Sequence, residues 1–228
     1  MNIGIIGAGH IGGTLTRRLR ELGHDVKVAN SRSPETLADL ADETGATPVW
    51  AKDAAADADL VIVSIPQKNV PDLAVGIVDA RKPGAPVIET NNYYPQQRDG
   101  EIADIEDGQV ESAWVAEQIG APVYKVFNGI FWKHLLERGK PSGTPNRIAL
   151  PVAGEDGAGR ELVHGIVDAL GFDPSTQGPS RSRGGSSPER RCTAKISMHS
   201  GLVRRLPRRH RSAPQRGARA RASAAASQ

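Results

Sequence analysis

The stretch Asn2–Leu22, NIGIIGAGHIGGTLTRRLREL, decides the fold of this 228-residue chain. Its first five residues are a short apolar run that is typical of a buried strand. Apolar residues then recur at every third or fourth position from Ile11 to Leu22, which is the spacing of an amphipathic helix. Between the two runs lies Gly7–Gly12, in the pattern G-x-G-x-x-G. The stretch therefore predicts a strand, a glycine turn and a helix.

A glycine pattern in this position is typical of dinucleotide-binding proteins. Gly7 would permit the tight turn, Gly9 would let the backbone approach a pyrophosphate, and Gly12 would let the helix pack closely on the strand. The free N–H groups at the start of the helix would face the phosphates. The predicted cofactor-binding residues of the turn are Gly7, Ala8, Gly9, His10, Ile11 and Gly12. The alternative is a glycine turn that binds nothing.

The choice of dinucleotide depends on the end of the second predicted strand, at Asn30, Ser31 and Arg32. An NAD enzyme would place a carboxylate here to hold the ribose 2′-hydroxyl. No carboxylate is present, and Arg32 supplies a guanidinium that suits a 2′-phosphate, with Ser31 as a further donor. We therefore predict NADP as the cofactor; the alternative is that Arg32 is a solvated surface charge.

Strands and helices alternate along the rest of the first 174 residues. Such alternation predicts an α/β fold with a doubly wound, mostly parallel sheet, the Rossmann fold that binds NAD(P). We expect strands at 2–6, 25–29, 47–49, 60–66, 86–89 and 123–127 and within 147–154, and helices at 11–22, 34–44, 70–78, 110–119 and 157–170, with a helical turn in 51–59.

Two further segments should lie at the carboxyl edge of this sheet, where ligands bind in open α/β folds. The fourth strand ends in Ser64, Ile65 and Pro66, and Pro66 would hold the backbone against a nicotinamide ring or simply end the strand. The fifth strand is followed by TNNYYP, which contains Asn91 and Asn92. Amides and phenols of this kind can contact a carboxamide, a ribose or a planar substrate.

Charge divides the chain at about residue 174. The whole chain has 29 Lys and Arg against 26 Asp and Glu, and residues 175–228 hold 13 of the basic residues but one of the acidic ones. Residues 1–174 therefore have a net charge of −9, which argues against a general affinity for nucleic acid. No run is apolar and long enough for a membrane span, and no signal peptide precedes the first strand. We expect a cytoplasmic protein.

No catalytic side chain can be named from the sequence. The one cysteine, Cys192, lies in the basic segment, so we expect neither a disulfide nor a cysteine metal site. His24 lies in a predicted helix-to-strand turn, and helix packing explains His134 as well as acid–base chemistry does. His10, inside the glycine turn, would contact cofactor phosphate or ribose rather than transfer a proton.

These features together resemble the NADPH-dependent reductases of the deazaflavin coenzyme F420. The resemblance covers residues 1 to about 174 and is carried by GIIGAGHIGGTL, ANSRSPETL, VIVSIP, TNNYYPQQRDG, KVFNGI and ALPVAGEDGAG. It implies that NADP binds through Ala8–Gly12, Ser31 and Arg32, that Ser64, Ile65 and Pro66 lie by the nicotinamide, and that Asn91, Asn92 and Asn128 line the space between two rings.

In this family hydride passes directly between the nicotinamide and coenzyme F420 as co-substrate, so orientation matters more than an acid or base. The resemblance leaves open an NADPH-dependent reductase of a small imine or carbonyl, similar to pyrroline-5-carboxylate reductase, and a non-catalytic NADP-binding module. It implies a small-molecule substrate and leaves a homodimer open.

The segment after Pro174 departs from the family. Ser175–Gln228 is rich in Arg, Ser and Pro, and we expect it to be a disordered tail produced by a frameshift. If one base is restored before the Ser175 codon, the same nucleotides can encode VDAGPLEESWRQQPGTPVYGKDF, which resembles the family's last strand and ending. The predicted domain is thus 1–174. The rival interpretation is a basic arm that binds nucleic acid.

Overall fold

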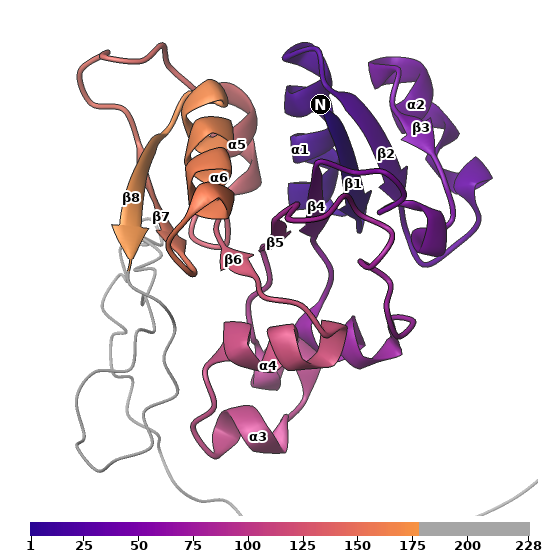
Figure 1. Ribbon diagram of the computed structural model, residues 1–228. Coiled ribbons are helices and arrows are strands. Elements are labelled where there is room, and N and C mark those ends of the chain that lie inside the picture. Colours follow the sequence, from indigo (N-terminus) through magenta and orange to yellow (C-terminus); the bar gives the residue numbers. More distant parts are fainter. Residues whose placement is uncertain (178–228) are drawn as a thin grey trace, which may run out of the picture. The chain divides into compact units, whose positions relative to one another are not determined.

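An eight-stranded sheet in the order β3-β2-β1-β4-β5-β6-β7-β8 forms the frame of the protein (Figure 1). The computed structural model describes residues 1–177. Neighbouring strands are parallel except β6 and β7, which are antiparallel. The doubly wound, mostly parallel sheet predicted from the sequence is confirmed. The strands are β1 Asn2–Ile6, β2 Asp25–Ala29, β3 Thr47–Pro48, β4 Leu60–Val63, β5 Val87–Glu89, β6 Tyr124–Lys125, β7 Ala149–Ala153 and β8 Asp173–Gln177.

Helices and helical turns connect the strands and cover both faces of the sheet. The α-helices are α1 His10–Glu21, α2 Ala38–Thr44, α3 Ala103–Glu106, α4 Glu111–Ile119, α5 Trp132–Glu137 and α6 Ala158–Ala169. Shorter turns are η1 Pro34–Leu37, η2 Ala51–Asp53, η3 Gln67–Asp72 and η4 Pro95–Asp99. Along residues 1–177, no helix is both long and apolar enough to cross a membrane.

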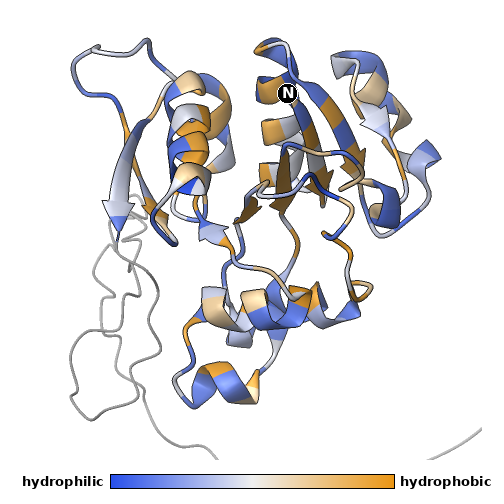
Figure 2. Cartoon of the chain, viewed as in Figure 1, coloured by the Kyte–Doolittle hydropathy of each residue, from blue (hydrophilic) through white to orange (hydrophobic). Residues whose placement is uncertain are grey.

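The core consists of two apolar layers because successive side chains of a strand point to opposite faces of the sheet. Ile3 and Ile5 of β1 pack into the layer that contains Leu15 of α1. Ile6 packs into the other layer, together with Val115 of α4. Burial of each such side chain stabilises the fold by about 1.5–3 kcal/mol. The central strands are accordingly the most apolar part of Figure 2.

The predicted helix at 70–78 is wrong. The chain there forms η3, a 3₁₀ turn that contains Pro71, and then continues in turns through Gly76, which has a φ of 73°. Proline has no N–H for a helical hydrogen bond, and a positive φ is incompatible with a right-handed helix. The apolar spacing alone did not reveal these interruptions. The sixth strand is also shorter than the predicted 123–127, and Phe127, beyond its end, has a φ of 65°.

Strand β8 extends to Gln177, three residues beyond the predicted domain boundary. Ser175, Thr176 and Gln177 lie in register with Pro151, Val152 and Ala153 of β7. Their side chains are exposed, and β8 is correspondingly pale or blue in Figure 2. Main-chain pairing therefore places these residues in the sheet without an apolar side-chain pattern. The predicted frameshift and disorder of the remaining tail, 178–228, fall outside the described residues.

Candidate functional site

Five neighbouring strands bring the predicted cofactor-binding residues to one edge of the sheet. Strands β2, β1, β4, β5 and β6 are consecutive in the sheet and mutually parallel, so their carboxyl ends lie along the same edge. The glycine turn follows β1, and the other predicted segments follow β2, β4, β5 and β6. A doubly wound sheet binds ligands at this edge. The topology therefore assembles one candidate site from segments that are far apart in the sequence.

The glycines of the turn have different physical roles. A Cβ atom at Gly12 would lie 1.8 Å from the Gly7 carbonyl oxygen, and one at Gly7 would lie 2.1 Å from the Ser64 carbonyl oxygen. Both positions therefore need glycine for the fold itself. A Cβ atom at Gly9 would meet nothing within 4 Å. Gly9 thus faces open space, which is where a pyrophosphate would approach the backbone.

Helix α1 begins next to this open space without a side-chain cap. Gly9 is its N-cap residue and makes no side-chain hydrogen bond. The first N–H groups of the helix lack intrahelical acceptors, and the helix dipole adds partial positive charge there. A groove of about 600 Å³ adjoins the turn and is lined by the turn, η1, α1, α2 and α5, including Gly9, Gly13 and Trp132. The turn and the helix start together fit an anionic phosphate group.

His10 stacks on an aromatic residue that sequence reasoning did not place in the site. The rings of His10 and Trp132 lie 5.0 Å apart with 10° between their planes. Trp132 begins α5, which follows β6, and His10 begins α1, so the contact joins the starts of two helices. His134 faces Phe131 in an edge contact with ring centroids 5.7 Å apart. The His10 side chain thus borders the glycine turn, and its predicted contact with the cofactor stays a prediction.

The loop after β2 leaves Arg32 available for a ligand. The Asn30 side chain accepts a hydrogen bond from the Arg32 N–H at 2.8 Å and donates one to the Thr36 hydroxyl at 2.9 Å. The Asn30 side chain therefore orders the loop. Its direct contact with the cofactor stays a prediction. Within residues 1–177 the Arg32 guanidinium makes no hydrogen bond or ion pair. Ser31 beside it is exposed.

The ends of β4 and β5 are joined by two side-chain hydrogen bonds. The Thr90 hydroxyl donates to the Ser64 hydroxyl at 2.9 Å, and the Ile65 N–H donates to Asn91 Oδ1 at 3.3 Å. Asn91 is buried, and its Nδ2 has no acceptor within the described residues. A buried amide N–H without an acceptor costs about 1–3 kcal/mol. The carboxamide oxygen of a nicotinamide would fit this donor.

Asn92 and Asn128, which the family resemblance assigns to the same space, lie next to each other. Asn92 Nδ2 donates to the Asn128 carbonyl oxygen at 2.8 Å, and Asn128 Nδ2 lies 3.4 Å from Asn92 Oδ1. Phe127 precedes Asn128 and is buried with a φ of 65°, a strained conformation for an aromatic residue. Such strain persists only where surrounding contacts impose it, and it is frequent at functional sites.

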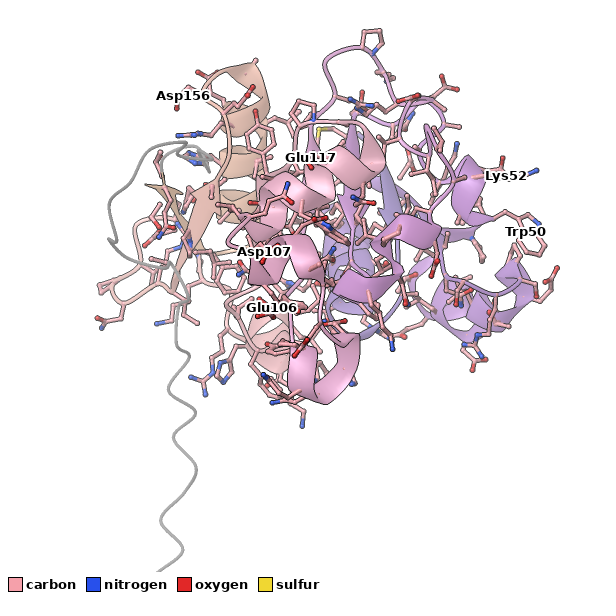
Figure 3. The ribbon with its side chains drawn as sticks, turned by 90° about the horizontal axis from the view of Figure 1, so that it is seen from below. Trp50, Lys52, Glu106, Asp107, Glu117 and Asp156 are labelled. Carbon is pink, nitrogen blue, oxygen red and sulfur yellow. The ribbon has the colours of Figure 1, made fainter. Side chains whose placement is uncertain are left out.

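The loop after β5 is held by polar contacts at its base. Asp99 is buried, accepts the Tyr94 N–H at 2.8 Å and forms an ion pair with Arg98 at 2.9 Å. The Tyr93 hydroxyl donates to Glu106 of α3 at 2.7 Å and accepts the Ile102 N–H. Figure 3 labels Glu106, the last residue of α3, and Asp107, which follows the helix. The polar loop is therefore ordered by its own contacts.

Charged groups are also buried beneath this edge. Glu89 ends β5 with no exposed surface, and Lys125 of β6 contacts it at 2.9 Å. Burial raises the pKa of Glu89, while Lys125 and the Asn91 N–H oppose that change. Burial alone would lower the pKa of Lys125, but the charges of Glu89 and Glu111 raise it. Sequence reasoning missed both residues, because their pairing depends on β5 and β6 being neighbours.

A known protein family matches the part of the chain that forms β1 to β5. Residues 2–93 match the family described as NADP oxidoreductase, coenzyme F420-dependent. This range contains β1 to β5, the glycine turn, the Arg32 loop and the Ser64–Asn91 contacts. Residues 2–93 are therefore similar to this family. The F420-dependent NADP oxidoreductase match ends at Tyr93, so Lys125, Asn128 and Trp132 lie outside it.

Solved structures extend the likeness to the whole fold. A hypothetical protein, SMa0349 from Sinorhizobium meliloti, is 28% identical with a TM-score of 0.64, over 78% of this chain and 85% of that chain. A candidate F420-dependent NADP reductase from Arthrobacter sp. FB24 is 20% identical with a TM-score of 0.62, over the same shares of the two chains. A reductive aminase from Aspergillus terreus, solved with NADPH and ethyl-5-oxohexanoate, is 16% identical with a TM-score of 0.52.

The aminase is a larger protein, and the likeness covers 78% of this chain but 55% of the aminase chain. At 16 and 20% identity, the aminase and the Arthrobacter protein support the fold alone. The F420-dependent NADP oxidoreductase match does not extend to residues 94–177.

Proposed function

We propose that this protein is an oxidoreductase that transfers a hydride between NADP(H) and the deazaflavin coenzyme F420. One observation supports NADP over NAD most directly. The Arg32 guanidinium is without an acceptor in residues 1–177, at the end of β2 where a carboxylate would be needed for NAD. The family match over residues 2–93 supports F420 as the second substrate.

Different residues along the edge of the sheet would bind different parts of the two ligands. The glycine turn and the start of α1 would bind the pyrophosphate, and Arg32 with Ser31 would bind the 2′-phosphate. Ser64, Ile65 and Pro66 would form the wall beside the nicotinamide, with Asn91 Nδ2 donating to its carboxamide oxygen. Asn92 and Asn128 would face the second ring.

Bound NADPH would supply the hydride from its nicotinamide ring. The side chains at the proposed transfer position are hydroxyl and amide groups: Ser64, Asn91, Asn92 and Asn128. These groups orient ligands by hydrogen bonds and do not ionise near neutral pH, so the proton that accompanies the hydride to F420 would come from water. The chain would therefore accelerate transfer by holding two planar rings in contact and excluding water from between them.

The test is to mix the protein with NADPH and oxidised F420 and to follow the absorbance of the deazaflavin. We expect the absorbance to fall with NADPH and to change far more slowly with NADH. No turnover of F420, together with oxidation of NADPH in the presence of a cyclic imine or ketone, would instead favour an imine or carbonyl reductase. NADPH binding without turnover of any of these substrates would favour a binding module.

A further inference from the structure

Glu89 and Lys125 form an ion pair inside the protein, directly beneath the proposed nicotinamide wall. They are register partners on the neighbouring strands β5 and β6. Lys125 Nζ lies 2.9 Å from Glu89 Oε1 and 3.2 Å from Glu111 Oε2 of α4. The Glu89 side chain has no exposed surface, and that of Lys125 is 16% exposed. The pair is therefore almost entirely removed from water.

Burial of an ion pair is poor evidence for a stabilising role. Removing two charges from water is costly, and well-packed apolar side chains of similar volume often serve stability equally well. A strand end that needed only stability would suit Val or Leu, as found along β4. The role of the ion pair is therefore expected to lie in the other hydrogen bonds that its atoms make.

The remaining hydrogen-bonding capacity of the pair is used on the main chain of Asn91. Glu89 Oε2 accepts the Asn91 N–H at 2.8 Å, and Lys125 Nζ donates to the Asn91 carbonyl oxygen at 2.9 Å. Both main-chain polar groups of Asn91 thus end on the same ion pair. Because these two hydrogen bonds fix the Asn91 main chain, they also fix where its side chain starts and which way it points.

The Asn91 side chain in turn contacts the wall formed by Ser64, Ile65 and Pro66. Its Oδ1 accepts the Ile65 N–H at 3.3 Å, while the adjacent Thr90 hydroxyl bonds Ser64. The contacts form a continuous path from Lys125 and Glu89, through Asn91, to Ile65. Glu89 has no exposed surface and Lys125 is 16% exposed, and the contact of the pair with the wall runs through Asn91.

We propose that Glu89 and Lys125 are positioning residues, which set Asn91 and the Ser64–Ile65 wall so that the nicotinamide ring is held at one orientation for hydride transfer. The inference rests on the proposed function, because it needs a nicotinamide at this wall. It assigns the two residues no direct contact with the cofactor. Loss of the pair should therefore affect the ring and spare the phosphate and 2′-phosphate contacts.

The test compares Lys125→Met, Glu89→Gln and the double variant Glu89→Leu/Lys125→Met with the unchanged protein. Lys82→Met is the control, because Lys82 pairs with Asp59 at 2.7 Å on the surface. For each variant, thermal unfolding, the Kd for NADPH, and kcat and KM with F420 are measured. The fluorescence enhancement and anisotropy of saturating NADPH report the nicotinamide ring without requiring turnover.

For variants that remain folded, we expect kcat to fall about tenfold or more and the enhancement of bound NADPH to decrease. The Kd for NADPH should change less than about threefold, and Lys82→Met should match the unchanged protein. Glu89→Gln keeps an acceptor for the Asn91 N–H. Its kcat and NADPH fluorescence should therefore lie between those of the unchanged protein and those of Lys125→Met. This graded order is not expected of a purely structural pair.

The inference is overturned if a folded variant keeps normal kcat and normal NADPH fluorescence. It is also overturned if lost activity follows the folded fraction alone. If the unchanged protein immobilises NADPH but never reduces F420, the proposed function fails instead, and the fluorescence of the variants still decides the positioning role.

Discussion

The two halves of the candidate site are built by different means. On the side of β1 and β2, most of the proposed contacts come from the backbone, in the glycine turn and at the start of α1. The Asn30 side chain is the exception there, because it orders the loop that carries Arg32. On the side of β5 and β6, side chains form the contacts: the Glu89–Lys125 pair, the paired Asn92 and Asn128, and the Asp99 contacts. A phosphate is round and charged, so main-chain N–H groups can bind it. A flat ring must be oriented, which requires directed side-chain contacts.

This contrast predicts that substitutions on the backbone-built side will affect the fold or cofactor affinity. Substitutions on the side-chain-built side should affect the geometry of transfer and local stability. The glycine turn offers the sharpest test, because Gly12 and Gly9 lie three residues apart and have opposite surroundings.

Gly12→Ala should have the largest effect. Its Cβ atom would lie 1.8 Å from the Gly7 carbonyl oxygen, so β1 and α1 would have to separate. We expect the free energy of unfolding to fall by about 3 kcal/mol or more. Urea unfolding followed by circular dichroism measures this change, and a variant of normal stability would show that the turn can relax.

Gly9→Ala should leave the fold intact and weaken cofactor binding. A Cβ atom at Gly9 meets nothing within 4 Å in the protein, and Gly9 has a φ of −73°, which alanine adopts freely. The methyl group would occupy the space of the pyrophosphate. We expect stability within about 0.5 kcal/mol of the unchanged protein and NADPH affinity about a hundredfold lower, or about 3 kcal/mol. Unchanged NADPH affinity would place the pyrophosphate elsewhere.

Arg32→Ala should weaken NADPH binding about tenfold, which corresponds to about 1.4 kcal/mol, and leave NADH binding unchanged. The reason is that the guanidinium would contact only the 2′-phosphate. Lys52→Ala removes another cation and serves as the control; Lys52 lies on the turn η2 and is labelled in Figure 3. Calorimetric titration with both cofactors measures the effect. An equal loss for NADH would mean that Arg32 supports the loop rather than the phosphate.

Asp99→Asn tests the side-chain-built loop through its pH dependence. Burial alone would raise the pKa of Asp99, but the Arg98 guanidinium and the N–H groups of Tyr94 and Lys68 outweigh it and lower this pKa. The stability from these contacts is therefore present above the ordinary carboxyl pKa, about 3.9. It is lost as pH falls through the lowered value of the folded protein.

At pH 7 we expect Asp99→Asn to be about 1 kcal/mol less stable than the unchanged protein. The difference should shrink as pH falls below about 4. Urea titrations at several pH values measure it. A constant difference across this range would mean that the carboxylate charge contributes nothing.

The sequence predicted the strand, turn and helix of the backbone-built side correctly because the signals are local, and the cofactor contacts there stay a prediction. Glycine spacing, the absent carboxylate after β2 and the apolar run of β4 each lie within a few residues. Lys125 and Trp132 carry no such signal, since their importance depends on which strand lies beside which. The helix predicted at 70–78 failed because Pro71 and Gly76 interrupt it.

Strand β8 shows where the predicted frameshift can be tested. Its last three residues are exposed and polar, so nothing in their side chains selects them for the sheet. Restoring one base would place Val at the position of Ser175. Resequencing the source DNA across the Pro174 codon should reveal the missing base. An intact frame for Ser175–Gln228 in independent clones would refute the frameshift.

The most direct test of the account is the stereochemistry and rate of single-turnover hydride transfer from NADPH deuterated at one face of C4. We expect the deuteride to move to F420 from one face only, and hydride transfer to be much faster with NADPH than with NADH. Transfer from both faces, or no transfer to F420 at all, would contradict a site that holds two rings in one fixed orientation.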